Sequence, residues 1–360
     1  MLNRLIKDLL PILSISDFHV QEGACVWVRD NGILRPGTAS KGPIKRQDVM
    51  DFLHYHESTT GLPSDKVEEV LQKRGDVDIT CSIDKVRFRG NLYRSNGRQL
   101  AIALRRVSDE IPRLDQLNLP PKWLKLVESS RGLLLVTGAT GSGKTTTTAS
   151  TLDYINHTRN GHILTLEDPV EYILTSKKCL INQRHIGRDA PEYQSALRAA
   201  MREDPDVIFI GELRDEKTVK TALDAANTGH LVISTLHTLN AQQSVERIMS
   251  FFPPEQRDWA QRTLAQVLLG TISQVLVPTA DKQGRVLAAE LMVNTNAVKQ
   301  AIGEGKPNQI FSAMDTGSQD GQLLLNKSLA ELVLKRKISP EEALFRTYNS
   351  DGLLKDLTRA

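Results

Sequence analysis

The sequence predicts an α/β protein in which a mostly parallel sheet, covered by helices on both faces, follows a smaller α+β domain. Two observations predict this fold class. From about residue 122 onward, short apolar runs alternate with helical stretches, which is typical of parallel strands joined by crossover helices. Before about residue 107, apolar and polar residues alternate over several short segments, as half-buried strands do.

The composition is that of a globular protein of two or three domains. The chain has 360 residues, of which 40% are hydrophobic and 25% charged, and each domain is long enough to bury its own core. The net charge of +3 and the aromatic content of 5% argue against a nucleic-acid partner. The three cysteines, Cys25, Cys81 and Cys179, form no C-x-x-C pair, so neither a zinc finger nor a disulfide framework is expected, and a reducing cytoplasm is the simplest setting.

Residues 1–107 are expected to form the α+β domain. Five apolar residues recur at helical spacing at the N-terminus, Leu2, Leu5, Ile6, Leu9 and Leu10, which indicates an amphipathic helix and not a targeting segment. The stretch "ACVWVRDNGILRP" predicts a hairpin that turns at Asp30, Asn31 and Gly32. Two helices are expected in "RQDVMDFLHYHES" and "SDKVEEVLQKRG", and three strands in "DVDITCSI", "KVRFRGNLYRS" and "QLAIALRRV".

Residues 108–121 carry three prolines and little periodicity, so they are expected to be a linker. The second domain then covers residues 122–360, beginning with a helix around "KWLKLVESS". Its strand candidates are "GLLLVTG", "HILTLE", "DVIFIGE" and "LVISTLH". A largely helical tail is expected from about residue 272 to residue 360. No apolar stretch approaches the roughly 18 residues that span a bilayer.

A phosphate-binding loop stands between the first of these strands and the next helix. Gly138 to Thr145, "GATGSGKT", matches G-x-x-x-x-G-K-[ST] in full. Its backbone N–H groups and the helix N-terminus are expected to bind the phosphates of ATP, with Lys144 on the β- and γ-phosphates and the Thr145 hydroxyl on Mg²⁺. The expected nucleotide-binding residues are Gly138, Thr140, Gly141, Ser142, Gly143, Lys144, Thr145 and Thr146.

Hydrolysis also needs a carboxylate that orients water, and two strand ends supply acids. Glu212 follows the apolar run "DVIFIG" and is the expected general base; the alternative is an ordinary strand-end acid that faces solvent. Glu167 follows "HILTL" and is expected to act through Mg²⁺ or its waters, because ligands bind at the carboxyl ends of parallel strands. A structural salt bridge is the alternative there, and Asp168 and Glu171 are weaker candidates.

Two histidines flank a third apolar run in "TGHLVISTLHT". His230 precedes the run and His237 follows it, and both are candidates for sensing the γ-phosphate. Single histidines are more often structural, and neither has partners at a metal-binding spacing.

The four motifs together, GATGSGKT, LEDPVEY, GELRD and TGHLVISTLHT, resemble those of the secretion-ATPase superfamily, and within it the PilT-type retraction ATPases of bacterial type IV pili. The segments "ISDFHV" and "RFRGN" resemble parts of that family's N-terminal domain. The resemblance implies a RecA-like ATPase domain preceded by a PAS-like domain, assembled as a homohexamer. It also implies that Arg89 and Arg105 reach the phosphates.

Two further features bear on the place of the chain within that family. The four-cysteine insertion of pilus-extension and type II secretion ATPases is missing, which favours a retraction motor. The retraction family's segment "AIRNLIREGK" is represented by "AVKQAIGEGK", in which Gly303 stands at the position of an arginine. A glycine inside a helix costs about 0.5–1 kcal/mol relative to alanine.

The motifs predict an Mg²⁺-dependent ATPase, and the resemblance implies that it powers type IV pilus retraction. The implied partner is an inner-membrane pilus platform protein, which would hold the ring at the cytoplasmic face of the inner membrane. Within the family, the alternatives are an ATPase of a related type II or type IV secretion or conjugative pilus system and an accessory retraction ATPase. Outside this reading, a nucleic-acid translocase and a nucleotide-binding scaffold with little turnover stay open.

Overall fold

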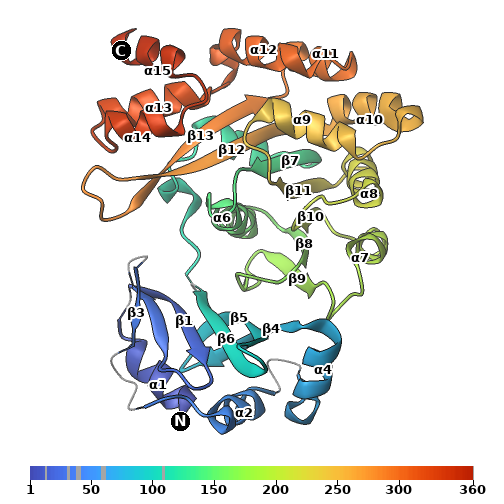
Figure 1. Cartoon of the computed structure of the whole chain (residues 1–360). Helices are drawn as coiled ribbons and strands as arrows, with labels where there is room; N and C mark the ends of the chain where they lie inside the picture. Colours follow the sequence, from blue (N-terminus) through green and yellow to red (C-terminus); the bar gives the residue numbers. More distant parts are fainter. Residues whose placement is uncertain (13, 31–32, 38–41, 58–61, 108–109, 360) are drawn as a thin grey trace. The chain divides into compact units, whose positions relative to one another are not determined.

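A computed structural model describes residues 1–360 except 13, 31–32, 38–41, 58–61, 108–109 and 360. The chain divides into two compact units, Met1–Glu110 and Ile111–Ala360. Each unit has its own sheet (Figure 1).

The first unit is an antiparallel sheet packed against short helices. Six strands lie in the order β3-β2-β1-β6-β5-β4, and every neighbouring pair is antiparallel. The strands are β1 (Ile15–Gln21), β2 (Trp27–Asp30), β3 (Ile33–Pro36), β4 (Asp76–Ile83), β5 (Val86–Ser95) and β6 (Gln99–Val107). The helices are α1 (Leu2–Leu9), α2 (Arg46–Tyr55), α4 (Val67–Arg74) and the short 3-10 turn η1 (Ser64–Lys66).

The N-terminal helix and the β2–β3 hairpin of the first unit lie where the sequence indicated them. All five apolar residues of the N-terminal pattern are buried in the core of the first unit, as an amphipathic helix packed on its own domain requires. Strands β2 and β3 pair antiparallel, with Asp30 opposite Ile33, although the turn residues Asn31 and Gly32 lie outside the described residues.

The second unit contains a seven-stranded sheet in the order β13-β12-β7-β11-β10-β8-β9. All neighbouring pairs are parallel except β12 and β13. The strands are β7 (Gly132–Thr137), β8 (Gly161–Glu167), β9 (Cys179–His185), β10 (Val207–Ile210), β11 (Leu231–Leu236), β12 (Leu268–Pro278) and β13 (Arg285–Val293). This arrangement confirms the predicted α/β fold class.

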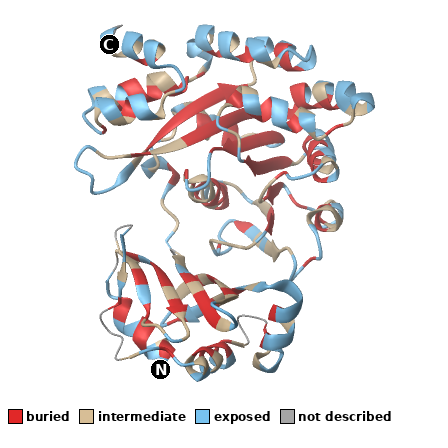
Figure 2. Ribbon diagram, viewed as in Figure 1, coloured by how far each residue is buried: buried red, intermediate tan, exposed pale blue. Residues whose placement is uncertain are grey.

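Helices cover both faces of the parallel sheet because its central strands are apolar on both sides. In β7, Leu133 and Leu135 pack into one core, while Leu134 and Val136 point to the opposite face and pack into another. The first core is completed by α7 (Tyr193–Ala200), α8 (Glu216–Asn227), α9 (Ala241–Ser250) and α10 (Pro254–Val267), and the second by α5 (Pro121–Val127) and α6 (Lys144–Thr158). Figure 2 shows the resulting buried strands between exposed helix surfaces.

The tail corrects the prediction of a largely helical segment from about residue 272. It begins with the long antiparallel pair β12 and β13, because "TISQVLVP" and "RVLAAELMV" are rich in the β-branched and apolar residues that suit a buried strand. Helices follow only afterwards, as α11 (Asn296–Gly303), α12 (Ile310–Thr316), α13 (Leu325–Leu334), α14 (Pro340–Arg346) and α15 (Ser350–Arg359). Three 3-10 turns, η2 (Leu114–Gln116), η3 (Pro307–Gln309) and η4 (Ser318–Asp320), complete the second unit.

Gly303 is the last residue of α11 and not a mid-helix residue as the motif suggested. Its helical cost is therefore smaller than that of an interior glycine. Within the described residues, no helix combines the length and the apolar character that crossing a membrane requires.

Candidate nucleotide site

Four parallel strands end at the same edge of the second sheet and bring the predicted motifs together. Thr137, the last residue of β7, pairs with Leu236 of β11, and the end of β10 pairs with both β11 and β8. The phosphate loop, Glu167, Glu212 and His237 follow or complete these strands. The edge therefore has the position at which open α/β sheets bind ligands.

The phosphate loop has the backbone that its glycines permit. Gly138, Gly141 and Gly143 all have positive φ, at 143°, 79° and 91°, a region that other residues rarely adopt. A Cβ on Gly138 would also lie only 2.5 Å from Oγ of Ser142 and 2.6 Å from the carbonyl oxygen of Gln274. The loop leads directly into α6, whose N-terminus is suited to bind an anion.

The side chain of Lys144 contacts the beginning of the phosphate loop. Its Nζ donates hydrogen bonds to the carbonyl oxygens of Gly138 at 2.7 Å and Ala139 at 3.0 Å. Burial lowers the pKa of Lys144, whereas the negative charges of Glu212 and Glu171 act to raise it. A cation beside the loop is what binding of a polyphosphate requires.

His237 and Glu212 continue a line of polar side chains that begins at Lys144. Nδ1 of His237 lies 3.4 Å from Nζ of Lys144, and Nε2 of His237 lies 3.7 Å from Oε1 of Glu212. The side chain of Glu212 is only 22% exposed. A half-buried carboxylate beside a phosphate loop supports the role of a base for water more than that of a solvent-facing acid.

Glu167 is buried at the end of β8 and held by neutral partners. Its Oε1 accepts hydrogen bonds from Oγ1 of Thr165 at 2.6 Å and Nε2 of Gln183 at 3.2 Å. Burial raises the pKa of Glu167 to about 7, although these hydrogen bonds lower it and the charge of Glu171 raises it further. No ion pair of Glu167 is found among the described residues, so the structure does not show the salt bridge that was the alternative for this residue.

The side-chain oxygens at this edge suit an Mg²⁺ ion that binds together with a nucleotide. No group of three or more His, Cys, Asp or Glu residues that could hold a metal occurs in the described parts of the chain. Mg²⁺ bound with a nucleotide needs few protein ligands, since phosphates and waters complete its octahedron. The Thr145 hydroxyl at the start of α6 and the Glu167 carboxylate are oxygen donors of the required kind.

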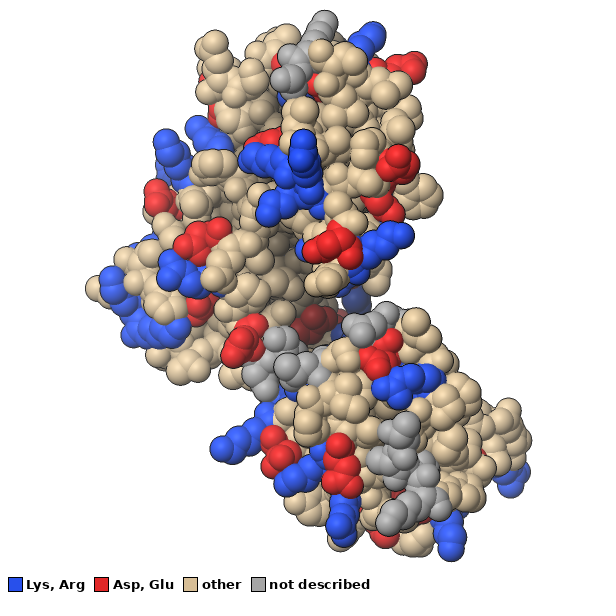
Figure 3. Space-filling model, turned by 90° about the vertical axis from the view of Figure 1, so that its left-hand side faces the viewer, with Lys and Arg blue, Asp and Glu red and all other residues tan. Residues whose placement is uncertain are grey.

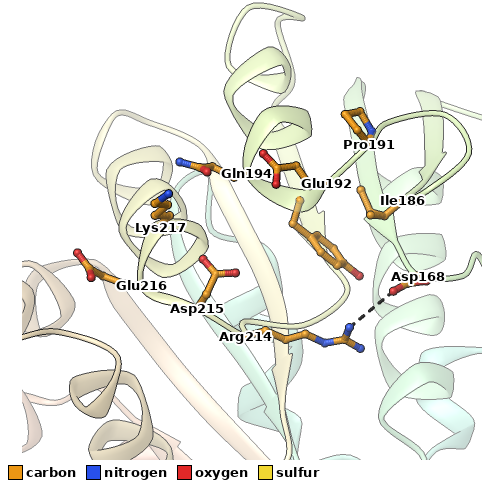
Figure 4. A pocket seen from close by; sticks show the side chains of 10 residues that line it. Asp168, Ile186, Pro191, Glu192, Gln194, Arg214, Asp215, Glu216 and Lys217 are labelled. Carbon is orange, nitrogen blue, oxygen red and sulfur yellow. Dashed lines mark ion pairs between the residues drawn. The ribbon is translucent and has the colours of Figure 1, made fainter.

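Arg214 was not among the predicted site residues, yet it connects two of the acidic motifs. Its Nε donates to Oε2 of Glu212 at 2.8 Å, and its Nη1 lies 3.6 Å from Oδ2 of Asp168. The pair with Asp168 borders a hollow of about 530 Å³ between α7 and the start of α8 (Figure 4). The position of Arg214, two residues after Glu212 in "GELRD", was the available signal, but spacing alone does not show where its side chain points.

His230 lies at the start of β11, at the opposite end of the strand from His237 and the phosphate loop, which corrects its candidacy for sensing the γ-phosphate within this chain. It directly precedes β11, its carbonyl accepts from the N–H of Gly132 at the start of β7, and its Nδ1 lies 3.0 Å from the carbonyl oxygen of Ala225. The six residues of β11 separate the two histidines by roughly 20 Å at 3.3 Å per residue. Because the run between the two histidines reads as a strand, the sequence already indicated that they lie at its opposite ends.

Arg89 and Arg105 are direct cross-strand neighbours on β5 and β6 of the first unit. Asp17 on β1 is opposite Arg105 in turn, and its Oδ1 accepts a hydrogen bond of 2.7 Å from Nε of Arg105. Burial acts to raise the pKa of Asp17, but hydrogen bonds from Ser16 and Arg105 and the charge of Arg105 bring it below its usual value. The two arginines therefore form one cationic pair on the sheet of the first unit.

Comparison with known proteins places these features in a family. The Type II/IV secretion system protein family matches residues 64–343. The chain belongs to this family. It is 41% identical over 295 residues to a twitching motility protein of Neisseria gonorrhoeae, covering 82% of this chain and 79% of that protein. It is 38% identical over 329 residues to the type IV pilus retraction ATPase PilT of Pseudomonas aeruginosa, covering 91% and 93% of the two chains.

The fold agrees with that of a solved member of the same family. A crystal structure of the pilus retraction motor PilT with bound ADP matches 98% of both chains with a TM-score of 0.88 and 39% sequence identity. This match confirms the predicted resemblance and the α/β ATPase fold. Family membership also confirms that the chain is an ATPase.

Proposed function

We propose that the chain is an Mg²⁺-dependent ATPase that works as a homohexameric ring and powers the retraction of a type IV pilus. The observation that carries this proposal is the line Lys144–His237–Glu212 at the carboxyl edge of the sheet, in a chain closely similar to retraction ATPases. The partner would be an inner-membrane pilus platform protein, to which the ring binds from the cytoplasmic side.

The residues of the second unit divide the reaction between them. The loop N–H groups and Lys144 bind and orient the triphosphate, and Mg²⁺, held through Thr145 and through Glu167 or its waters, would supply charge neutralisation at the phosphates. Glu212 accepts the proton of the attacking water, a contribution of about 10²–10⁴-fold. His237 lies beside both Lys144 and Glu212 and would respond to the terminal phosphate.

The first unit would contribute Arg89 and Arg105 to the phosphates. An arginine at the γ-phosphate contributes about 10³–10⁵-fold in well-studied P-loop enzymes. Arg105 is bonded to Asp17 in this structure, so contact with a nucleotide would replace that ion pair. Such an exchange would make catalysis depend on the position of the first unit, as a motor requires.

The translocase alternative has less support. Acidic side chains lie beside basic ones on the visible face of each unit (Figure 3), and the whole chain has 46 Lys and Arg against 43 Asp and Glu. A surface that binds single-stranded DNA needs a basic, aromatic-bearing groove. Addition of single-stranded DNA is expected to leave the ATPase rate unchanged, and strong stimulation would support the translocase instead.

The test of the proposed function compares wild type with Glu212→Gln. The variant is expected to bind ATP normally and to lose at least about tenfold in turnover, with Glu246→Gln on an exposed helix surface as the matched control. Normal turnover in Glu212→Gln would refute the assigned base. Size measurement of the purified protein with nucleotide should give a ring of six.

In pilus-bearing cells of the source organism, Glu212→Gln should leave pili assembled but not retracted. Normal retraction would refute the motor role.

A further inference from the structure

The loop that follows His237 is held from two directions by residues outside the nucleotide motifs. Thr238, Leu239 and Asn240 connect β11 to α9. Within this connection, Oγ1 of Thr238 lies 2.7 Å from Oγ of Ser244, and the Asn240 side chain caps α9 through the N–H of Gln243 at 2.8 Å. The loop is therefore fixed to its own helix, and it continues directly from His237, which follows the last residue of β11.

The first outside contact comes from the C-terminal helices. The hydroxyl of Tyr348, between α14 and α15, donates a hydrogen bond of 3.0 Å to the carbonyl oxygen of Leu239. Asn326 on α13 holds the residues on both sides of Tyr348, because it accepts a hydrogen bond from the Thr347 hydroxyl and donates one of 2.9 Å to the carbonyl oxygen of Asn349. These bonds hold the chain on both sides of Tyr348, whose own side chain is 51% exposed and is joined to the loop by its hydroxyl.

The second outside contact comes from the sheet. Oε1 of Glu290, a buried residue of β13, accepts a hydrogen bond of 2.8 Å from the N–H of Ala241, the first residue of α9. A carboxylate is well placed at a helix N-terminus, where the first N–H groups lack partners within the helix. Leu239 and Ala241 are two and four residues from His237, so both contacts act on the segment that carries this histidine.

We propose that Tyr348 is a positioning residue for ATP hydrolysis, which together with Glu290 holds the 238–240 loop so that His237 lies between Lys144 and Glu212. This inference rests on the role proposed above for His237. The distances from His237 to Lys144 and Glu212, 3.4 and 3.7 Å, leave little tolerance, since polar interactions weaken steeply with distance and misalignment. The C-terminal segment between α14 and α15 is thereby connected, through the 238–240 loop, to the nucleotide site.

The test uses Tyr348→Phe, which removes the hydroxyl and keeps the ring. The matched control is Tyr154→Phe, which removes a tyrosine hydroxyl that donates to Glu128 at 3.2 Å on a helix of the same unit. The kcat for ATP is expected to fall about two- to tenfold in Tyr348→Phe, as loss of one hydrogen bond in a catalytic arrangement would give. The KM and the thermal midpoint should stay close to those of the control, which a purely structural role would not produce.

A double-mutant cycle with His237→Gln then shows whether Tyr348 acts through that histidine. Tyr348→Phe is expected to cause no further loss of kcat in the His237→Gln background, and amide hydrogen exchange of the segment 236–243 should increase in Tyr348→Phe and not in the control. An equal loss in both backgrounds, or a kcat of Tyr348→Phe equal to that of the control, would overturn the positioning role.

The cycle also separates failure of this inference from failure of the proposed function. If His237→Gln alone keeps wild-type turnover, the proposed role of His237 is wrong, and the positioning inference is overturned with it. If His237→Gln loses turnover while Tyr348→Phe does not, the positioning inference alone is overturned.

Discussion

Arg214 donates a hydrogen bond of 2.8 Å from its Nε to Oε2 of Glu212. This bond and the charge of Glu212 raise the pKa of Arg214 further, so the arginine stays cationic. The bond leaves Oε1 of Glu212 directed toward His237, at 3.7 Å from its Nε2. Arg214 thus orients the Glu212 carboxylate through Oε2, and Oε1 faces His237 beside the phosphate loop.

Replacing Arg214 should therefore impair catalysis more than nucleotide binding. Arg214→Ala is expected to lower kcat by about tenfold to a hundredfold, because a lost charge-assisted hydrogen bond is worth roughly 1.5–3 kcal/mol. Arg214→Lys should recover only part of this, since lysine lacks the planar fork of the guanidinium. Steady-state ATPase assays check both, with the exposed Arg113→Ala as control. Equal kcat values for Arg214→Ala and the control would show that Glu212 needs no such support.

Gly138→Ala should weaken nucleotide binding. Gly138 has φ of 143°, and the added Cβ would lie 2.6 Å from the backbone oxygen of Gln274, so either the loop or β12 must move. Strain of this kind costs about 1–3 kcal/mol, which predicts a fall of roughly tenfold or more in ATP affinity. Titration with a fluorescent ATP analogue measures it. The control is Gly284→Ala, where the nearest atom is 4.0 Å away; equal affinities would contradict the loop geometry.

The stability of the second unit should depend on pH through Glu290. Burial raises its pKa to about 7 from the usual 4.5, and the hydrogen bond from the Ala241 N–H only partly offsets this. The folded state then binds the proton more tightly than the unfolded state between these values. The cost of ionising Glu290 is therefore absent at low pH and reaches its full size above about pH 7.

Glu290→Gln removes that cost and keeps an oxygen acceptor for the Ala241 N–H. The variant should gain stability relative to wild type as pH rises from 5 to 8, by up to about 3 kcal/mol at 1.36 kcal/mol per pKa unit. Denaturant unfolding at both pH values measures the difference, and Glu246→Gln on an exposed surface is the control. A difference that stays constant with pH would show that Glu290 titrates normally. Tyr348, whose pKa is raised by burial and by the charge of Glu290, stays neutral over this range.

The parts of the fold and site that the sequence predicted are those with local signals. Long apolar runs such as "GLLLVT" specify central strands whatever surrounds them, and the phosphate loop carries its own glycines. The strand ends brought Glu167, Glu212 and His237 to one edge because parallel strands share a direction. These residues could be found before the structure.

The remaining features depend on tertiary contacts. Strand β9, "CLINQRH", alternates only weakly and sits at the sheet edge, so it was not predicted, although its Gln183 holds Glu167. Tyr348 contacts Leu239 across 109 positions of the chain, a separation that no local pattern reports.

Replacing Gly303, the last residue of α11, should change the stability of the protein and leave its ATP turnover unchanged. Gly303 is exposed, its φ lies outside the left-handed region, and a Cβ would meet only the Cβ of Ala265 at 3.8 Å, an ordinary contact. Gly303→Ala should therefore stabilise the protein by about 0.4–1 kcal/mol through the unfolded state, raising Tm by about 1–4 °C. ATP turnover should not change, because α11 contributes no residue to the nucleotide edge.

Calorimetry and an ATPase assay together check this, with Gly305→Ala as the contrasting variant. Gly305 has φ of 66°, and a Cβ added to it would lie 2.7 Å from Nε2 of Gln261, so that substitution should destabilise the protein. A lower Tm in Gly303→Ala would show that this glycine is required by the local backbone.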